Sequence, residues 1–197
     1  MELMSLPPEQ HPFVRWRTPL LRQARTALVH GVRHGRPPGI MLEEWPFELR
    51  EVRATFVTLE KGGKLRGCIG HLEATQPLVV DITENAVAAA IHDPRFPPVS
   101  EDEMEEITVS LSILTPPEPL EVTDEAGLRA CLRPGVDGLI LREGRRQATF
   151  LPSVWEELPS VEDFLRHLKY KGGWAPDYWS ARMAACRYQA DYLSETD

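Results

Sequence analysis

A cysteine set between glycines, with an arginine just upstream, is the part of this sequence best suited to chemistry. Residues 64–70 read KLRGCIG, so that Cys68 lies between Gly67 and Gly70, and Arg66 precedes it by two residues. Glycine inside a strand gives up packing and backbone entropy, and therefore marks a bulge or a close approach to the backbone. Cys68 is accordingly a candidate nucleophile, and Arg66, Gly67 and Gly70 are candidate ligand contacts. The alternative is that Cys68 is a small buried filler, the usual role of a free cysteine.

Strand geometry limits the partners that this thiol can have. Side chains alternate across a strand, so we expect Arg66 and Cys68 on one face, with Cα atoms about 7 Å apart. A guanidinium at that position favours the thiolate. His71 should face the opposite way, which removes the simplest cysteine–histidine dyad.

The next candidates lie on a helix that we expect from a cap at Thr75 to about His92. Asp81, Glu84 and Asn85 share a polar stripe on it. Glu84 is a candidate general base or ligand-fixing carboxylate, and Asn85 a candidate ligand contact. The alternative is an ordinary solvated helix face.

The run Asp93-Pro94-Arg95-Phe96 follows this helix directly. Each residue has a standard role in ending a helix, because proline blocks its continuation and Asp93 can bond the turn. In the other interpretation Arg95 supplies a fixed cation to the site that contains Arg66, suited to a carboxylate or phosphate.

The elements that must position these residues predict an α+β fold with mainly antiparallel sheet and flanking helices. A Gly62-Gly63 turn joins strands at 53–60 and 64–71. A stiff proline-rich connector at 115–119 divides the chain into halves. The remaining expected elements are helices at 18–35, 124–132 and 160–169, a capping box at Ser100 and Glu103, a half-buried strand at 107–113, a hairpin of 138–142 with 147–151, and a closing strand at 182–192.

Composition excludes several classes of function. The 197 residues carry a net charge of −8, which disfavours an electrostatic hold on nucleic acid or on an anionic membrane. No apolar run approaches the roughly 20 residues of a membrane span, and no secretory signal is visible. The 3 cysteines are too few for a disulfide framework, so we expect a cytoplasmic protein. His30 and His34 lack a third ligand in view, and no cofactor motif is present, so we expect neither metal nor cofactor.

The sequence resembles the AMMECR domain family. The resemblance rests on Leu65 to Gly70, on 84–86, on the Asp93 to Phe96 run, and on segments near 109–117, 137–139 and 150–152. It implies a two-lobed fold with a cleft between unequal lobes and the glycine–cysteine motif near that cleft. Residues 1–12 would be a loose arm, and 13–197 a single domain of this type.

Two functions follow from the resemblance and the residues together. In the first, a small polar or anionic ligand is bound or transformed in the inter-lobe cleft near the motif. In the second, the chain is a non-catalytic partner module for Memo-type or radical-SAM proteins, with which prokaryotic members are associated. That module would need an apolar surface, and Trp174 and Trp179 are its candidates.

Overall fold

The computed structural model describes residues 12–196, so the predicted N-terminal arm, apart from residue 12, lies outside the described residues. The chain forms two compact units. Unit 1 runs to Leu114 and takes up the chain again from Asp191, and unit 2 is Thr115–Ala190. The predicted proline-rich connector begins at this boundary. The inter-lobe cleft stays a prediction.

Unit 1 is built on a four-stranded sheet of order β2-β1-β3-β8. Strands β1 (Thr55–Lys61) and β2 (Lys64–Gly70) form the predicted hairpin. Gly62 and Gly63 turn the chain with φ of 57° and 71°, a region that residues with a Cβ rarely adopt. Strand β2 lies at the edge of this sheet, so one side of its backbone is not paired with another strand.

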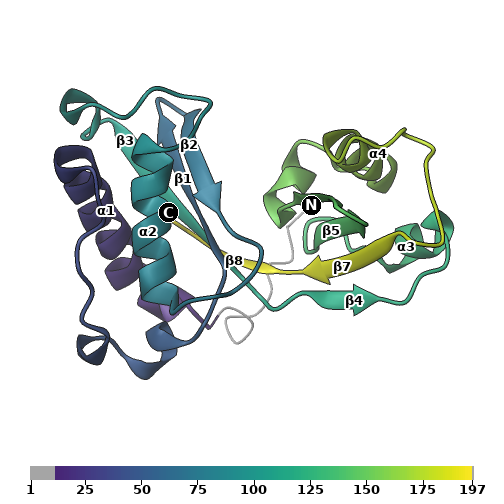
Figure 1. Ribbon diagram of the computed structural model, residues 1–197, viewed down its shortest axis with the longest axis horizontal. Coiled ribbons are helices and arrows are strands. Elements are labelled where there is room, and N and C mark those ends of the chain that lie inside the picture. Colours follow the sequence, from purple (N-terminus) through teal and green to yellow (C-terminus); the bar gives the residue numbers. More distant parts are fainter. Residues whose placement is uncertain (1–11, 197) are drawn as a thin grey trace. The chain divides into compact units, whose positions relative to one another are not determined.

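Two helices cover one face of this sheet (Figure 1). Helix α1 (Arg17–His34) ends at Gly35, whose φ of 68° makes a left-handed cap. Helix α2 (Leu78–Ile91) packs against α1, β1 and β2. The apolar faces of these elements form one core, which includes Leu20, Leu28, Val57, Leu59, Ile82, Ala86, Val109 and Leu111.

Helix α2 does not begin as predicted. Pro77 occupies the cap position, and no side chain caps the helix there. Thr75 is therefore not the cap. Proline is favourable at this position because its missing N–H would lack an intrahelical partner anyway.

Strand β3 (Ile107–Leu114) also differs from its prediction. Ser110 and Ser112 are buried, as are the apolar residues that alternate with them. The strand is therefore covered on both faces over most of its length, where strict alternation predicted a half-buried strand.

Unit 2 contains a second sheet of order β4-β7-β5-β6, made by β4 (Glu118–Leu120), β5 (Gly138–Glu143), β6 (Arg146–Phe150) and β7 (Ala184–Tyr188). Asp124 caps helix α3 (Glu125–Cys131), and Ser160 caps helix α4 (Val161–Lys171), both through side-chain contacts with the first turn. Trp155 stacks on Phe164 in the core of this unit, with ring centroids 3.8 Å apart.

The predicted single closing strand is two strands. β7 pairs within unit 2, and β8 (Ala190–Ser194) joins the sheet of unit 1. The remaining described helical turns are short 3-10 segments at Val14–Trp16, Leu42–Glu44, Phe47–Arg50, Glu101–Glu103 and Pro152–Glu156. Among the described residues, no helix has both the length and the apolar character that a membrane crossing requires.

Candidate functional site

At Cys68, the backbone groups on the unpaired edge of strand β2 form hydrogen bonds with the segment that follows helix α2. The Cys68 backbone N–H donates to Asp93 Oδ2 at 2.8 Å, and the Cys68 carbonyl accepts from Arg95 Nη2 at 3.2 Å. Asp93 and Arg95 thus supply the hydrogen bonds that a neighbouring strand would make with this edge residue. The two sequence motifs meet at this point.

Asp93 is held as an anion by the groups around it. Arg95 donates to it from Nε, from Nη2 and from its backbone N–H. The Arg95 side chain, helped by the Cys68 N–H, holds the pKa of Asp93 well below its usual range, although burial opposes this. Asp93 therefore does more than end a helix, because its buried carboxylate fixes both Arg95 and the backbone of the cysteine.

Arg95 combines a fixed position with access to solvent. Its side chain is 53% exposed, whereas the Asp93 side chain beneath it is 2% exposed. The bond to Asp93 is the main cause that raises the pKa of Arg95, and Cys68 adds a smaller effect in the same direction. Its Nε and Nη2 are used by Asp93 and Cys68, which leaves Nη1 as the part of the guanidinium that can meet a ligand.

The Cys68 sulfur lies beside a hydroxyl on the neighbouring strand. Thr58 is the cross-strand partner of Cys68, and its Oγ1 donates to Sγ at 3.3 Å. Thr58 also pairs with Ser110 on β3, so that the register puts these three side chains in one row across the sheet. Cys68 is partly buried and is a free thiol.

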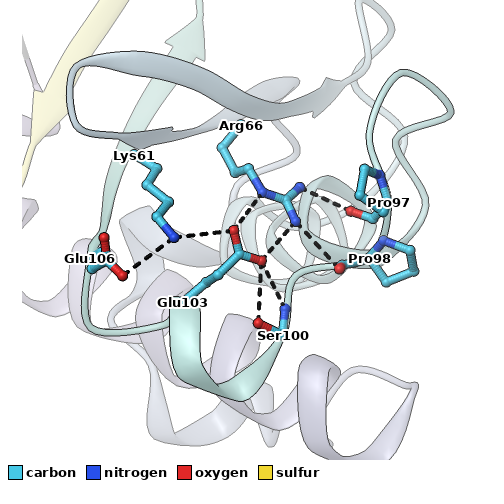
Figure 2. A network of polar contacts seen from close by, with 7 residues as sticks. All are labelled: Lys61, Arg66, Pro97, Pro98, Ser100, Glu103 and Glu106. Atoms are coloured by element: carbon cyan, nitrogen blue, oxygen red, sulfur yellow. Dashed lines mark hydrogen bonds and ion pairs between the residues drawn. The ribbon is translucent and has the colours of Figure 1, made fainter.

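Arg66 does not join this row. The register passes from Leu59 opposite Gly67 to Glu60 opposite Leu65, so Arg66 is the extra residue of a bulge. The alternation that predicted Arg66 and Cys68 on one strand face does not hold across a bulge. The Arg66 guanidinium instead donates to the Glu103 carboxylate from Nε and Nη2, at 3.1 and 2.9 Å. It also donates to the carbonyls of Pro97 and Pro98 (Figure 2).

Glu103 is the centre of this second network. It accepts from the backbone N–H of Ser100, which completes the predicted capping box, and it lies 3.5 Å from Lys61 Nζ (Figure 2). The Arg66 side chain, with Ser100, lowers the pKa of Glu103 to about 2. Arg66 is only 12% exposed. It holds the segment between α2 and β3 in place beside strand β2.

The two glycines of the motif have packing reasons of their own. A Cβ on Gly67 would lie 2.2 Å from the Ala89 carbonyl oxygen of α2. A Cβ on Gly70 would lie 2.2 Å from the Thr55 carbonyl oxygen and 2.5 Å from the ring of Phe56. Helix α2 and the Phe56 ring therefore make the close approaches that these glycines permit.

The predicted polar stripe of helix α2 is split between solvent and core. Glu84 is exposed and accepts from Gln76 Nε2 at 2.9 Å. Asn85 is buried and donates to Asp81 Oδ2 at 2.9 Å and to Thr55 Oγ1 at 3.0 Å. The solvated-face interpretation is thus wrong for Asp81 and Asn85, which cross-link α2 to the start of β1.

Sequence reasoning missed Thr58, and it named Asp81 only as part of a polar stripe and Asp93 only as a helix-stop residue. A helix-stop motif gives no sign that its aspartate reaches a distant strand edge, and Thr58 is one of several strand threonines. Among residues 12–196, no cluster of three or more His, Cys, Asp and Glu side chains is arranged to hold a metal.

The aromatic surface predicted in unit 2 is not formed by Trp174. This residue is 4% exposed, and its Nε1 donates to Glu143, which also accepts from Tyr178. Trp179 packs against the same core and donates to the Thr123 carbonyl. Trp174 is thus a core residue of unit 2, whereas Trp179 is partly buried and stays a candidate for the predicted surface.

Comparison with known proteins finds relatives over most of this chain. The AMMECR1 family model matches residues 21–193. A protein of Methanothermobacter thermautotrophicus is 41% identical over 181 residues, covering 89% of this chain and 92% of the relative. One of Thermotoga maritima is 40% identical over 188 residues, covering 91% and 98%. The crystal structure of an uncharacterised protein from Pyrococcus horikoshii superposes with a TM-score of 0.83 at 35% identity, covering 92% of each chain.

Proposed function

The chain belongs to the AMMECR1 family, and we propose that its unit 1 binds a small polar or anionic ligand beside Cys68 and Arg95. The observation that carries the proposal is the state of Arg95. It is an exposed guanidinium that a buried carboxylate holds in one orientation. Fixed orientation lowers the entropy that a ligand must remove on binding.

The charge of Asp93 sets the kind of ligand. Asp93 already neutralises much of Arg95, so the site does not need an anion, but the free Nη1 donors suit an oxygen acceptor such as a carboxylate, phosphate or carbonyl. Cys68, whose carbonyl accepts from the same guanidinium, carries the thiol, and the Thr58 hydroxyl lies beside that sulfur. Such a ligand would be within reach of a nucleophilic sulfur, and this is the route by which binding could become chemistry.

Glu84 and Asn85 keep different roles in this proposal. Asn85 is enclosed by Thr55 and Asp81 and supports the fold beneath the site. Glu84 is open to solvent on α2, and a contact between it and the ligand stays a prediction. Arg66, Gly67 and Gly70 support strand β2, and a contact between them and the ligand stays a prediction.

Inorganic phosphate is a suitable first probe of the Arg95 site. Isothermal titration of the full chain should give weak, saturable binding that Arg95→Gln abolishes. Arg15→Gln is the matched control, because Arg15 is also an exposed arginine of unit 1 and pairs with Glu48. If acetate, phosphate and sulfate all fail to bind to the wild-type protein, the anion form of the proposal is wrong.

A second candidate function is docking onto Memo-type or radical-SAM proteins. It is favoured by exposed apolar residues before β1, where Phe47 is 76% and Met41 62% exposed. Phe47→Ser should weaken the association with a purified partner of either class, while Cys68→Ser should leave it at full strength. The opposite pattern would assign the interaction to the cysteine site.

A further inference from the structure

A buried carboxylate of helix α2 faces a solvent-accessible imidazole at the end of strand β2. Asp81 is fully buried, and His71 Nδ1 lies 3.5 Å from Asp81 Oδ1. His71 is 55% exposed. In the described part of the chain, His71 is the only ionisable cation within ion-pair distance of Asp81.

The other contacts of Asp81 fix its carboxylate in one orientation. Oδ2 accepts from the Thr55 backbone N–H at 2.9 Å, from Thr55 Oγ1 at 2.6 Å and from Asn85 Nδ2 at 2.9 Å. Oδ1 accepts from Gln76 Nε2 at 3.1 Å. With Oδ2 saturated by three donors, Oδ1 is the oxygen that is left to act on His71.

We propose that His71 and Asp81 form a proton-transfer site, with His71 as the proton acceptor and Asp81 as its positioning residue. The Nδ1 side of the ring faces Asp81, so Nδ1 carries the proton and the lone pair of Nε2 is open to solvent. A carboxylate behind an imidazole selects this tautomer and holds the ring in one orientation.

The ligand of this site is a small molecule that presents an ammonium group. One of its N–H bonds breaks, the proton moves to His71 Nε2, and the electron pair stays on the nitrogen as the lone pair of a neutral amine. The Glu84 carboxylate shares the Gln76 amide with Asp81 and is exposed beside it, which favours a donor-rich or cationic ligand over an anionic one. The Nδ1–Oδ1 separation is longer than a formed hydrogen bond, and such contacts shorten when a ligand binds.

This site is separate from the one at Cys68. Thr55 faces α2, and Thr58, three residues further along β1, faces the opposite side of the sheet, where it contacts the Cys68 sulfur. The strand parity that removed His71 as the base for Cys68 therefore places it on the side of α2. Failure of the Cys68 proposal would leave this inference standing.

Two measurements on the full chain test the inference. Long-range 15N–1H NMR of the wild-type protein should show His71 with Nδ1 protonated and Nε2 unprotonated. Diethyl pyrocarbonate should modify His71 several-fold faster than His92, an exposed histidine beyond the end of α2. Asp81→Asn should reduce the His71 rate to that of His92, and Cys68→Ser should not change it.

The contradicting results are equally specific. A predominance of the Nε2-protonated tautomer in the wild-type protein would overturn the inference, even if Asp81→Asn fails to fold. Equal modification of His71 and His92, or an unchanged His71 rate in a folded Asp81→Asn variant, would reduce Asp81 to a structural residue.

Discussion

Asp93 Oδ2 accepts a hydrogen bond from the backbone N–H of Cys68, with 2.8 Å between the two atoms. This bond joins the end of helix α2 to the edge of strand β2 and connects the two most distinctive segments of the sequence. It also means that Arg95 is held relative to the Cys68 backbone by a carboxylate that both residues share.

Loss of the Asp93 carboxylate should destabilise the protein. Asp93→Ala leaves the Cys68 N–H without its acceptor and Arg95 without its partner, which should lower the free energy of unfolding by about 2–3 kcal/mol. Urea denaturation followed by circular dichroism measures this change. Asp177→Asn, at an exposed position of unit 2, should change stability by less than about 0.5 kcal/mol. Equal effects of the two variants would contradict the structural role of Asp93.

Glu103 should contribute a pH-dependent part of the stability. Its pKa in the folded protein is lowered from 4.5 to about 2, chiefly by Arg66. A group with a lowered folded pKa stabilises the fold above its unfolded pKa, and this stabilisation is lost as pH falls through the folded value. Glu103→Gln should therefore cost most stability above pH 5, and its difference from wild type should shrink between about pH 4.5 and 2.

The matched control for this prediction is Glu105→Gln, because Glu105 is an exposed neighbour of Glu103. Denaturation midpoints of the three proteins across that pH range give the comparison. A Glu103→Gln difference that stays constant with pH would show that the Arg66–Glu103 pair does not titrate with folding.

Gly67 and Gly70 should reject a methyl group for packing reasons alone. Gly67→Ala drives a Cβ against the Ala89 carbonyl, which is backbone and cannot step aside, so we expect a loss of about 3 kcal/mol. Gly39→Ala is the control, since a Cβ there meets nothing within 4 Å. Thermal denaturation of the two variants measures this loss. A Gly67→Ala protein as stable as the wild type would contradict the packing explanation and favour the view that Gly67 lets a ligand approach the backbone.

The buried ion pair of unit 2 should respond unequally to loss of its two members. Lys169 is fully buried and bonds Glu125 and the Pro176 carbonyl, whereas Glu125 also pairs with Arg129. Burial would raise the pKa of Glu125, but bonds from Lys169 and Arg129 lower it overall. Glu125→Gln leaves the buried Lys169 ammonium without a charged partner and should lower the free energy of unfolding by about 3–5 kcal/mol. Lys169→Met leaves Glu125 its arginine and should cost clearly less in the same denaturation experiment.

Local signals in the sequence predicted most of the secondary structure because the responsible physics is local. The positive φ of Gly35, Gly62 and Gly63 requires glycine, and Asp124 and Ser160 cap their own helices. These features need no knowledge of the rest of the fold.

The predictions were wrong where contacts between segments far apart in the sequence determine the structure. The division of 182–192 into two strands depends on pairing with two different sheets, and the bulge at Arg66 depends on the register with β1. In the candidate site, Cys68 and Arg95 do meet, but through Asp93, whose role requires the position of α2 relative to β2.

The rate at which iodoacetamide alkylates Cys68 in the folded protein, with and without phosphate, tests the proposed ligand site most directly. Peptide mass spectrometry separates Cys68 from Cys131 and Cys186. The proposal predicts that Cys68 reacts before denaturation, that phosphate slows this reaction but not that of the exposed Cys131, and that Arg95→Gln removes the protection. A Cys68 that reacts only after unfolding, or equally fast with and without phosphate, would contradict it.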